Sequence, residues 1–239
     1  FADDSRGGHI AHGKQIPMKN MPLLVGEPDK LTSYLSPVPG KPLTFHLSNL
    51  YPEKYAEGME LVPFFSLHES RYIMYWPQAT EEEADNIRLE QEKQEAERLK
   101  LDAVTIDRVV CGEQQPESDH FIASENSGAG VFEDIRWREA NGWFSYKLKN
   151  NDRKARHLYV AYFDKDRSRN FEILVNDVRV KGFSLTGNKG DEVQKLIIPI
   201  PESISQSETL TVKFLAMPGS MTGKIAEVRA LSQSVGEPE

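Results

Sequence analysis

The sequence predicts a mainly β protein, in which a small β unit and a C-terminal β-sandwich of the jelly-roll type are joined by one α-helix. Short segments rich in aromatic and β-branched residues recur between residues 104 and 235, and turn residues separate them, as is typical of consecutive strands. A long charged segment before them carries the signals of a helix. We therefore expect a β domain at residues 1–77, a helical linker at 78–103 and the β-sandwich domain at 104–235.

The composition excludes several classes of partner. Lys and Arg number 29 against 37 Asp and Glu, a net charge of -8, which disfavours nucleic acid because its phosphates select basic surfaces. No apolar run approaches the roughly 20 residues of a membrane span, so we expect no membrane partner. The one cysteine, Cys111, excludes an internal disulfide and a multi-cysteine zinc site, and we expect no cofactor.

The N-terminal end indicates that something is missing. The chain begins at Phe1 rather than at Met and contains no signal peptide. We therefore expect it to be part of a longer protein, whose missing part can hold a targeting signal.

Residues 1–77 predict a small β unit. Glycine and proline interrupt residues 1 to 30, where Met21–Val25 predicts one short strand. Leu31–Leu35 fits either a strand or a helical turn, whereas Leu43–Leu47 alternates as a strand does. Two strongly apolar segments, Leu61–Leu67 and Arg71–Trp76, predict a second strand pair. We expect a thin core that needs a neighbouring domain.

A helix is predicted to begin after Thr80 and to run to about Lys100. Thr80 and Glu83 have the spacing of a capping box, in which each side chain bonds the other residue's backbone N–H. Acidic residues in the first turn and basic residues in the last match the helix macrodipole. The apolar stripe is narrow, so we expect a mostly solvated helix that bridges two domains and an acidic run that is solvent-facing.

The second domain contains regularly spaced strand patterns. His157–Phe163 is apolar on both faces, which predicts a strand between two layers. Asn176 and Asp177 tolerate positive φ and predict a tight hairpin, while Trp137 falls in a predicted loop. The expected strands are Val104–Val110, Gly142–Leu148, His157–Phe163, Phe171–Val175, Leu196–Ile200, Thr209–Phe214 and Ala226–Leu231.

Several strings in the chain match the sequence pattern of a known family. Leu61–Phe65 with His68–Trp76 resembles the segment after the catalytic barrel in β-L-arabinofuranosidase-like glycoside hydrolases, that is, glycoside hydrolase family 127 and its relatives. Gly112–His120 followed by Gly142–Tyr146 resembles the C-terminal domain found on many Bacteroidetes members. The post-barrel region is also matched by Arg6–Ala11 and Pro37–Leu43.

This resemblance implies that the chain is the non-catalytic C-terminal part of a plant-glycan-degrading enzyme. The family has an (α/α)6 barrel with a cysteine nucleophile and a zinc ion held by further cysteines and a glutamate, none of which carries over, since Cys111 is alone. What it does imply is a barrel-associated β domain, a galactose-binding-like sandwich and the parent enzyme's catalytic barrel as intramolecular partner. The implied location is periplasmic or extracellular.

Trp137, Arg138 and Tyr146 are the candidate carbohydrate-binding residues, because an aromatic face beside a polar group suits a sugar ring. The alternative is that the aromatics of the Gly142–Leu148 strand are core residues. We favour the core for Trp143 and leave both interpretations open for Trp137.

Other polar residues have a functional and a structural interpretation. Cys111 needs a neighbouring base or metal to act as a nucleophile, so a packed thiol is preferred. His9 and His12 lack a third metal ligand, and we expect their loop to pack against the missing barrel or reach toward its site. The stretch from Asp164 to Asn170 begins like a calcium loop but lacks its glycine and its final glutamate, which favours a β-turn.

Glu113, Glu117, Asp119 and His120 form a polar cluster. Two carboxylates at the right separation can hydrolyse a glycoside, but these lie in a Gln/Glu/Ser-rich loop with no catalytic motif. We therefore expect no catalytic residue and no metal site in this chain. Three hypotheses remain: an accessory region that supports the barrel, a carbohydrate-binding module in residues 104–235 that takes plant polysaccharide, and an independent hydrolase, which we favour least.

Overall fold

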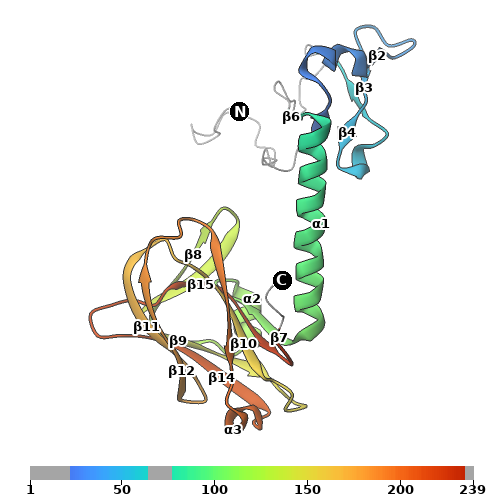
Figure 1. Cartoon of the computed structure of the whole chain (residues 1–239). Helices are drawn as coiled ribbons and strands as arrows, with labels where there is room; N and C mark the ends of the chain where they lie inside the picture. The colour runs from blue at the N-terminus through green and yellow to red at the C-terminus, as the bar shows by residue number, and fades with distance from the viewer. Residues whose placement is uncertain (1–21, 64–76, 235–239) are drawn as a thin grey trace. The chain divides into compact units, whose positions relative to one another are not determined.

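The computed structural model describes residues 22–63 and 77–234, and the chain divides into two compact units, residues 1–96 and 97–239 (Figure 1). The predictions for His9, His12 and the strand Arg71–Trp76 lie outside the described residues. The protein is mostly β, as predicted, and none of the described helices is long and apolar enough to span a membrane.

The N-terminal unit contains two small sheets. The first pairs β1 (Leu23–Val25) with β4 (Leu50–Tyr51) and β6 (Gln78–Ala79), and the second pairs β3 (Phe45–Leu47) with β2 (Leu35–Pro37) and β5 (Met59–Leu61). The described part of this unit also contains two 3-10 helices, η2 (Pro28–Tyr34) and η3 (Glu53–Tyr55), so the Leu31–Leu35 segment is mainly helical. Among the described residues of the unit, Leu24, Leu47 and Leu50 form a buried cluster.

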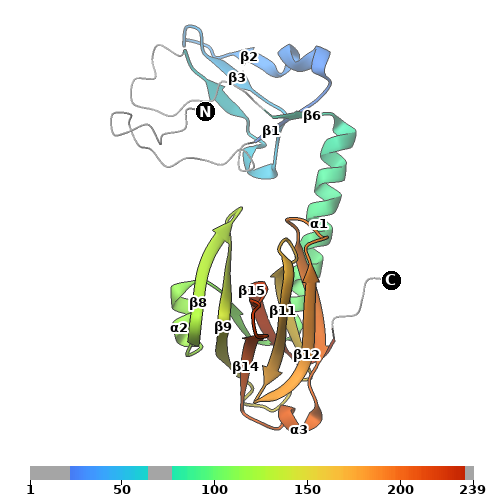
Figure 2. The ribbon, with the colours of Figure 1, turned by 90° about the vertical axis from the view of Figure 1, so that its left-hand side faces the viewer.

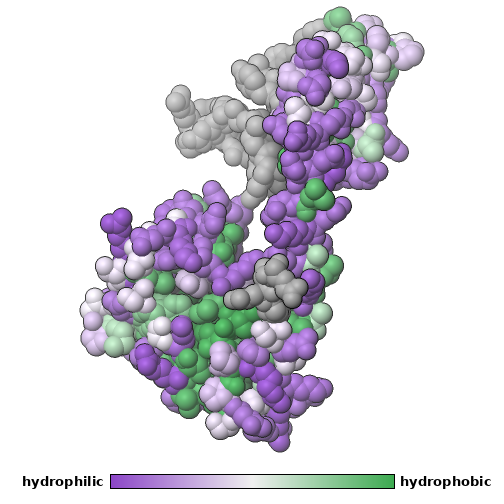
Figure 3. Space-filling view, in the orientation of Figure 1, coloured by the Kyte–Doolittle hydropathy of each residue, from purple (hydrophilic) through white to green (hydrophobic). Residues whose placement is uncertain are grey.

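Helix α1 (Glu81–Val104) begins with the predicted capping box: Glu83 Oε2 accepts from the Thr80 N–H at 2.8 Å, and Thr80 Oγ1 accepts from the Glu83 N–H at 3.3 Å. Ala84 is the buried residue of this helix, and its visible surface is largely hydrophilic (Figure 3). The helix extends a turn beyond the predicted end, because Leu101 and Val104 pack against the sandwich.

The sandwich has two layers of antiparallel strands. Layer A has the order β12 (Val178–Thr186), β11 (Arg167–Val175), β14 (Thr209–Ala216), β9 (Ile135–Lys149) and β8 (Ala123–Phe132), which lie side by side in Figure 2. Layer B has the order β13 (Val193–Pro199), β10 (His157–Phe163), β15 (Lys224–Leu231) and β7 (Thr105–Val110). The layers join where β9 meets β15, and the short helices α2 (Gln114–Asp119) and α3 (Glu202–Ser205) lie in connections.

The main core lies between the layers. Phe144 of β9 stacks on Phe214 of β14 with ring centroids 4.9 Å apart. Leu158 and Val160 of β10 enter this core, whereas Tyr159 faces a second cluster, which confirms the prediction that β10 is buried on both faces.

Two tight turns join neighbouring strands of layer A. The predicted turn at Asn176 and Asp177 is present, with φ of 48° and 64°. A second turn of the same kind at Glu133 and Asp134, with φ of 46° and 68°, joins β8 to β9. Trp137 therefore lies in a strand, and the prediction of a loop there is wrong, because the sequence does not reveal that the glycine-rich β8 pairs with it.

Candidate functional site

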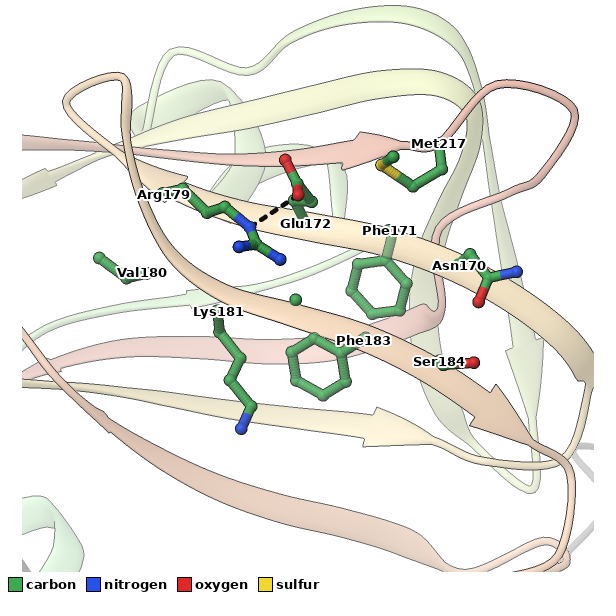
Figure 4. Close-up of a pocket in the computed structure, with 10 residues that line it drawn as sticks. Asn170, Phe171, Glu172, Arg179, Val180, Lys181, Phe183, Ser184 and Met217 are labelled. Carbon is green, nitrogen blue, oxygen red and sulfur yellow. Dashed lines mark ion pairs between the residues drawn. The ribbon is translucent and has the colours of Figure 1, made fainter.

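A groove of about 600 Å³ lies along β11 and β12 (Figure 4). Glu172 pairs across the strands with Gly182, and a Cβ atom at Gly182 would lie 2.4 Å from Nη2 of Arg179. The Arg179 side chain therefore crosses over Gly182, on the face that carries Glu172. The groove is lined by Asn170, Phe171, Glu172, Arg179, Val180, Lys181, Gly182, Phe183, Ser184 and Met217.

The groove combines polar groups with apolar surface. Arg179 Nε donates to Glu172 Oε1 at 2.6 Å, and the Arg179 side chain is 62% exposed, so its remaining N–H donors can reach a ligand. Asn170 and Ser184 are exposed and add an amide and a hydroxyl group. Met217 is 41% exposed and adds apolar surface. Phe171 and Phe183, which stack with ring centroids 4.7 Å apart, lie on the core side of the two strands, and Phe171 is buried. Such a surface fits a ligand that is itself amphipathic.

Sequence analysis did not identify this groove. Glu172 and Arg179 meet only because the register of β11 and β12 shifts at a β-bulge between Ile173 and Leu174. The available signal was Gly182, since an isolated glycine inside a strand indicates a bulge or a close approach.

Tyr146 is removed from the set of sugar-binding candidates by its burial. Its side chain is fully buried, and its hydroxyl donates to Glu117 Oε1 at 2.6 Å. No ring face is left for a sugar, so the core interpretation is the correct one for this residue.

Arg138 belongs to the same buried cluster. Its Nε and Nη2 donate to the two Glu117 oxygens at 2.6 and 2.7 Å, and the Gly112 N–H also donates to Glu117 at 2.7 Å. Burial alone would raise the pKa of Glu117, but the hydrogen bonds from Arg138 and Tyr146 hold that pKa below its usual value. This arrangement ties α2 to β9, and it occupies the Arg138 groups that a sugar would need.

Trp137 lies on the opposite face of β9 from Arg138 and Tyr146. It is half-buried in β9, where consecutive residues face opposite sides. Its ring covers Gly130, at which a Cβ atom would lie 2.2 Å away, and the Lys224 ammonium is 4.9 Å from the ring centroid. Trp137 thus packs in the second cluster, and the structure does not assemble the three predicted residues into one site.

Trp143 lies on the opposite face of β9 from the core residue Phe144. It is half-buried, so the favoured interpretation as a core residue is corrected. Its Nε1 donates to Glu125 Oε2 at 3.0 Å, and the Lys213 ammonium lies 4.3 Å from the ring centroid.

The remaining candidates have structural surroundings. Cys111 is fully buried, and burial raises the pKa of its thiol. His120 Nδ1 lies 2.6 Å from the Pro116 carbonyl oxygen and Nε2 lies 3.2 Å from Asp107 Oδ1. The described part of the chain contains no group of three or more potential metal ligands. Asp164 lies at the start of the connection from β10 to β11.

The fold and the groove together define a β-sandwich domain with an amphipathic surface groove. The sequence pattern of a family of unknown function, DUF6805, matches residues 100–231, and the chain belongs to this family. A second pattern, a domain of unknown function called DUF4986, matches residues 1–78. No curated protein matches the chain.

Several solved structures are similar to about half of the chain. A family 35 carbohydrate binding module from Clostridium thermocellum has 12% identity and a TM-score of 0.36, with 51% of this chain and 95% of that chain covered. A family 35 module from an environmental isolate has 16% identity and a TM-score of 0.40, with 50% and 91% covered. An exo-β-1,3-galactanase from Phanerochaete chrysosporium has 11% identity and a TM-score of 0.33, with 51% and 29% covered. At these identities the similarity concerns the fold alone.

Proposed function

We propose that this chain is a non-catalytic accessory region of a plant-glycan-degrading glycoside hydrolase, and that its sandwich binds carbohydrate in the groove over Gly182. The proposal places the parent enzyme in the periplasm or outside the cell. The observation that carries it is the Glu172–Arg179 pair, with Nε and Oε1 2.6 Å apart, in the groove that the exposed Met217 also lines.

The chemistry of the groove suits a saccharide. A sugar ring presents hydroxyl groups at its edge and C–H groups on its faces. The planar fork of Arg179 and the carboxylate of Glu172 can donate to and accept from neighbouring hydroxyls, and charge-assisted hydrogen bonds of this kind are the stronger ones. The exposed Met217 provides apolar surface for the C–H groups.

The N-terminal unit supports the accessory part of the proposal. Among its described residues the buried cluster is Leu24, Leu47 and Leu50, and a unit with a small core usually depends on a neighbour for stability. The neighbour that we propose is the (α/α)6 catalytic barrel of the parent enzyme, which the sequence resemblance implies. In this arrangement Glu117 stabilises the sandwich rather than acting as an acid, because both its oxygens accept from Arg138.

Calorimetric titration of the 239-residue chain with arabinan and pectic oligosaccharides tests the proposal. We expect heat of binding at millimolar sugar, strongly reduced in Arg179→Ala. Arg153→Ala is the matched control, because Arg153 also forms an exposed ion pair, 2.9 Å from Glu208, but contributes nothing to the groove. Absence of heat in the unaltered chain contradicts carbohydrate binding. Turnover of an aryl arabinofuranoside by this chain contradicts the non-catalytic assignment.

A further inference from the structure

The groove continues into a row of side chains that crosses layer A. In the registers of neighbouring strands, Glu125 of β8 lies opposite Trp143 of β9, Trp143 opposite Leu215 of β14, Leu215 opposite Glu172 of β11, and Glu172 opposite Gly182 of β12. Residues opposite one another share a face of the sheet, so these five form one surface row. The row runs across the strands and ends in the groove.

The row is much longer than one sugar ring. Neighbouring strands lie about 4.8 Å apart, so Trp143 is about 10 Å from Glu172 and about 14 Å from Gly182. Between them Leu215 is half-buried, and half-buried Leu174 lies beside Glu172 on the same face through its pairing with Lys213. The apolar side chains of Leu215 and Leu174 thus lie between the Trp143 ring and the hydrogen-bonding groups of the groove.

The Trp143 ring is held in place as a platform. Its Nε1–H donates to Glu125 Oε2, which fixes the orientation of the ring. The Lys213 ammonium lies 4.3 Å from the ring centroid, and Lys213 is half-buried. A cation–π contact contributes about 0.5–1 kcal/mol at an exposed site and about 2 kcal/mol when desolvated, so a ligand that takes the ring face displaces Lys213 at a cost in this range.

A basic side chain of this face lacks an acidic partner. Among the described residues, Lys213 forms no ion pair with a carboxylate, whereas Arg179 is paired with Glu172. Lys181 belongs to the other face of the sheet, because it pairs with the core residue Ile173. Protection of an edge strand does not explain Lys213, because β14 lies inside the sheet.

From these observations we infer that the ligand is an extended acidic oligosaccharide that lies across β9, β14, β11 and β12, with one sugar ring on Trp143 and a uronate carboxylate facing Lys213. This inference rests on the proposed carbohydrate binding and specifies its ligand class. It assigns Trp143, which lies outside the groove, to the binding surface.

Titration of the whole chain with galacturonate oligomers of increasing length tests the inference. The affinity is expected to rise about tenfold from the dimer to the hexamer, corresponding to about 1.4 kcal/mol. Trp143→Ala removes this gain, so that the hexamer binds no more tightly than the dimer, and Trp143→Phe retains part of the gain. Trp137→Phe is the matched control and behaves as the unaltered chain. Thermal unfolding of each variant establishes that it is folded.

The outcomes separate this inference from the proposed function. Binding of dimer and hexamer with equal affinity, or a gain with length that survives in Trp143→Ala, overturns the extended site while carbohydrate binding stands. Neutral arabino-oligosaccharides that bind as tightly as galacturonate oligomers of equal length overturn the acidic ligand. If no oligosaccharide of either kind binds the unaltered chain, the proposed function fails as well.

Discussion

Gly182→Ala is the sharpest test of the groove, because one added methyl group meets one flexible side chain. The new Cβ atom would lie 2.4 Å from Nη2 of Arg179, too close to coexist with it. The atom that must move is the end of an exposed arginine rather than backbone, so the side chain can swing away. The substitution therefore separates Arg179 from Glu172 without removing either charge.

The expected magnitudes differ for folding and for binding. Loss of an exposed ion pair costs about 0.2–1 kcal/mol, and alanine in place of glycine in a strand returns about 0.5–1 kcal/mol, so the free energy of unfolding changes little. Hydrogen bonds from a charged group contribute about 1.5–3 kcal/mol, so the affinity for oligosaccharide falls roughly tenfold to a hundredfold.

Calorimetric titration and thermal unfolding of the same preparation measure both quantities. Gly128→Ala is the matched control, because it adds the same methyl group to strand β8 with no atom within 4 Å. An affinity that is unchanged in Gly182→Ala, at unchanged stability, would refute the assignment of Arg179 to the ligand site.

Three further predictions concern the scaffold. Glu117→Ala leaves the half-buried Arg138 without its carboxylate partner and lowers the free energy of unfolding by about 3 kcal/mol, which urea denaturation measures. Because the folded-state pKa of Glu117 is depressed, the stability that its carboxylate contributes is complete above the unfolded pKa of about 4.3 and is lost as the pH falls through the lower folded value. The free energy of unfolding of Glu117→Ala should therefore fall less steeply with acid than that of the unaltered chain. Parallel stability–pH curves for the two proteins would contradict this. Cys111 should resist an aromatic disulfide reagent in the native state and react fully in urea, because it is buried with a raised pKa; fast native labelling would show an open site. Thr80→Ala should cost about 1 kcal/mol of local helix stability, seen as faster amide exchange confined to the first turn of α1.

Periodicity and turn chemistry predict much of the sandwich. The unbroken apolar residues of β10 predict that both its faces are buried. The turn at Asn176 and Asp177 is predictable because these residue types accept positive φ. Such signals are local, because each arises within one strand or one turn. The capping box of Thr80 and Glu83 is predictable for the same reason.

The candidate site was not predictable in this way, because it depends on register. Glu172 and Arg179 are separated by a turn and a bulge, and nothing in the sequence states which residues of β11 and β12 face each other. Strand β8 was not predicted for a related reason. Its residues are mostly small or polar, so they do not alternate between apolar and polar, and the strand is recognised only from its pairing with β9.

Three of the aromatic residues of β9 show which distinctions need the structure, because the sequence does not separate core rings from surface rings. Trp137, Trp143 and Tyr146 share one strand, yet the partner of the polar atom distinguishes a core ring from a surface ring. The Tyr146 hydroxyl donates to Glu117, a buried carboxylate that needs donors, so its ring must follow it inward. The Trp143 N–H donates to Glu125, an exposed carboxylate, so its ring is held at the surface. Aromatic density in a strand therefore favours a ligand platform only where the polar partner lies in water, and by that criterion Trp143 is the ring of this strand that fits the inferred ligand site.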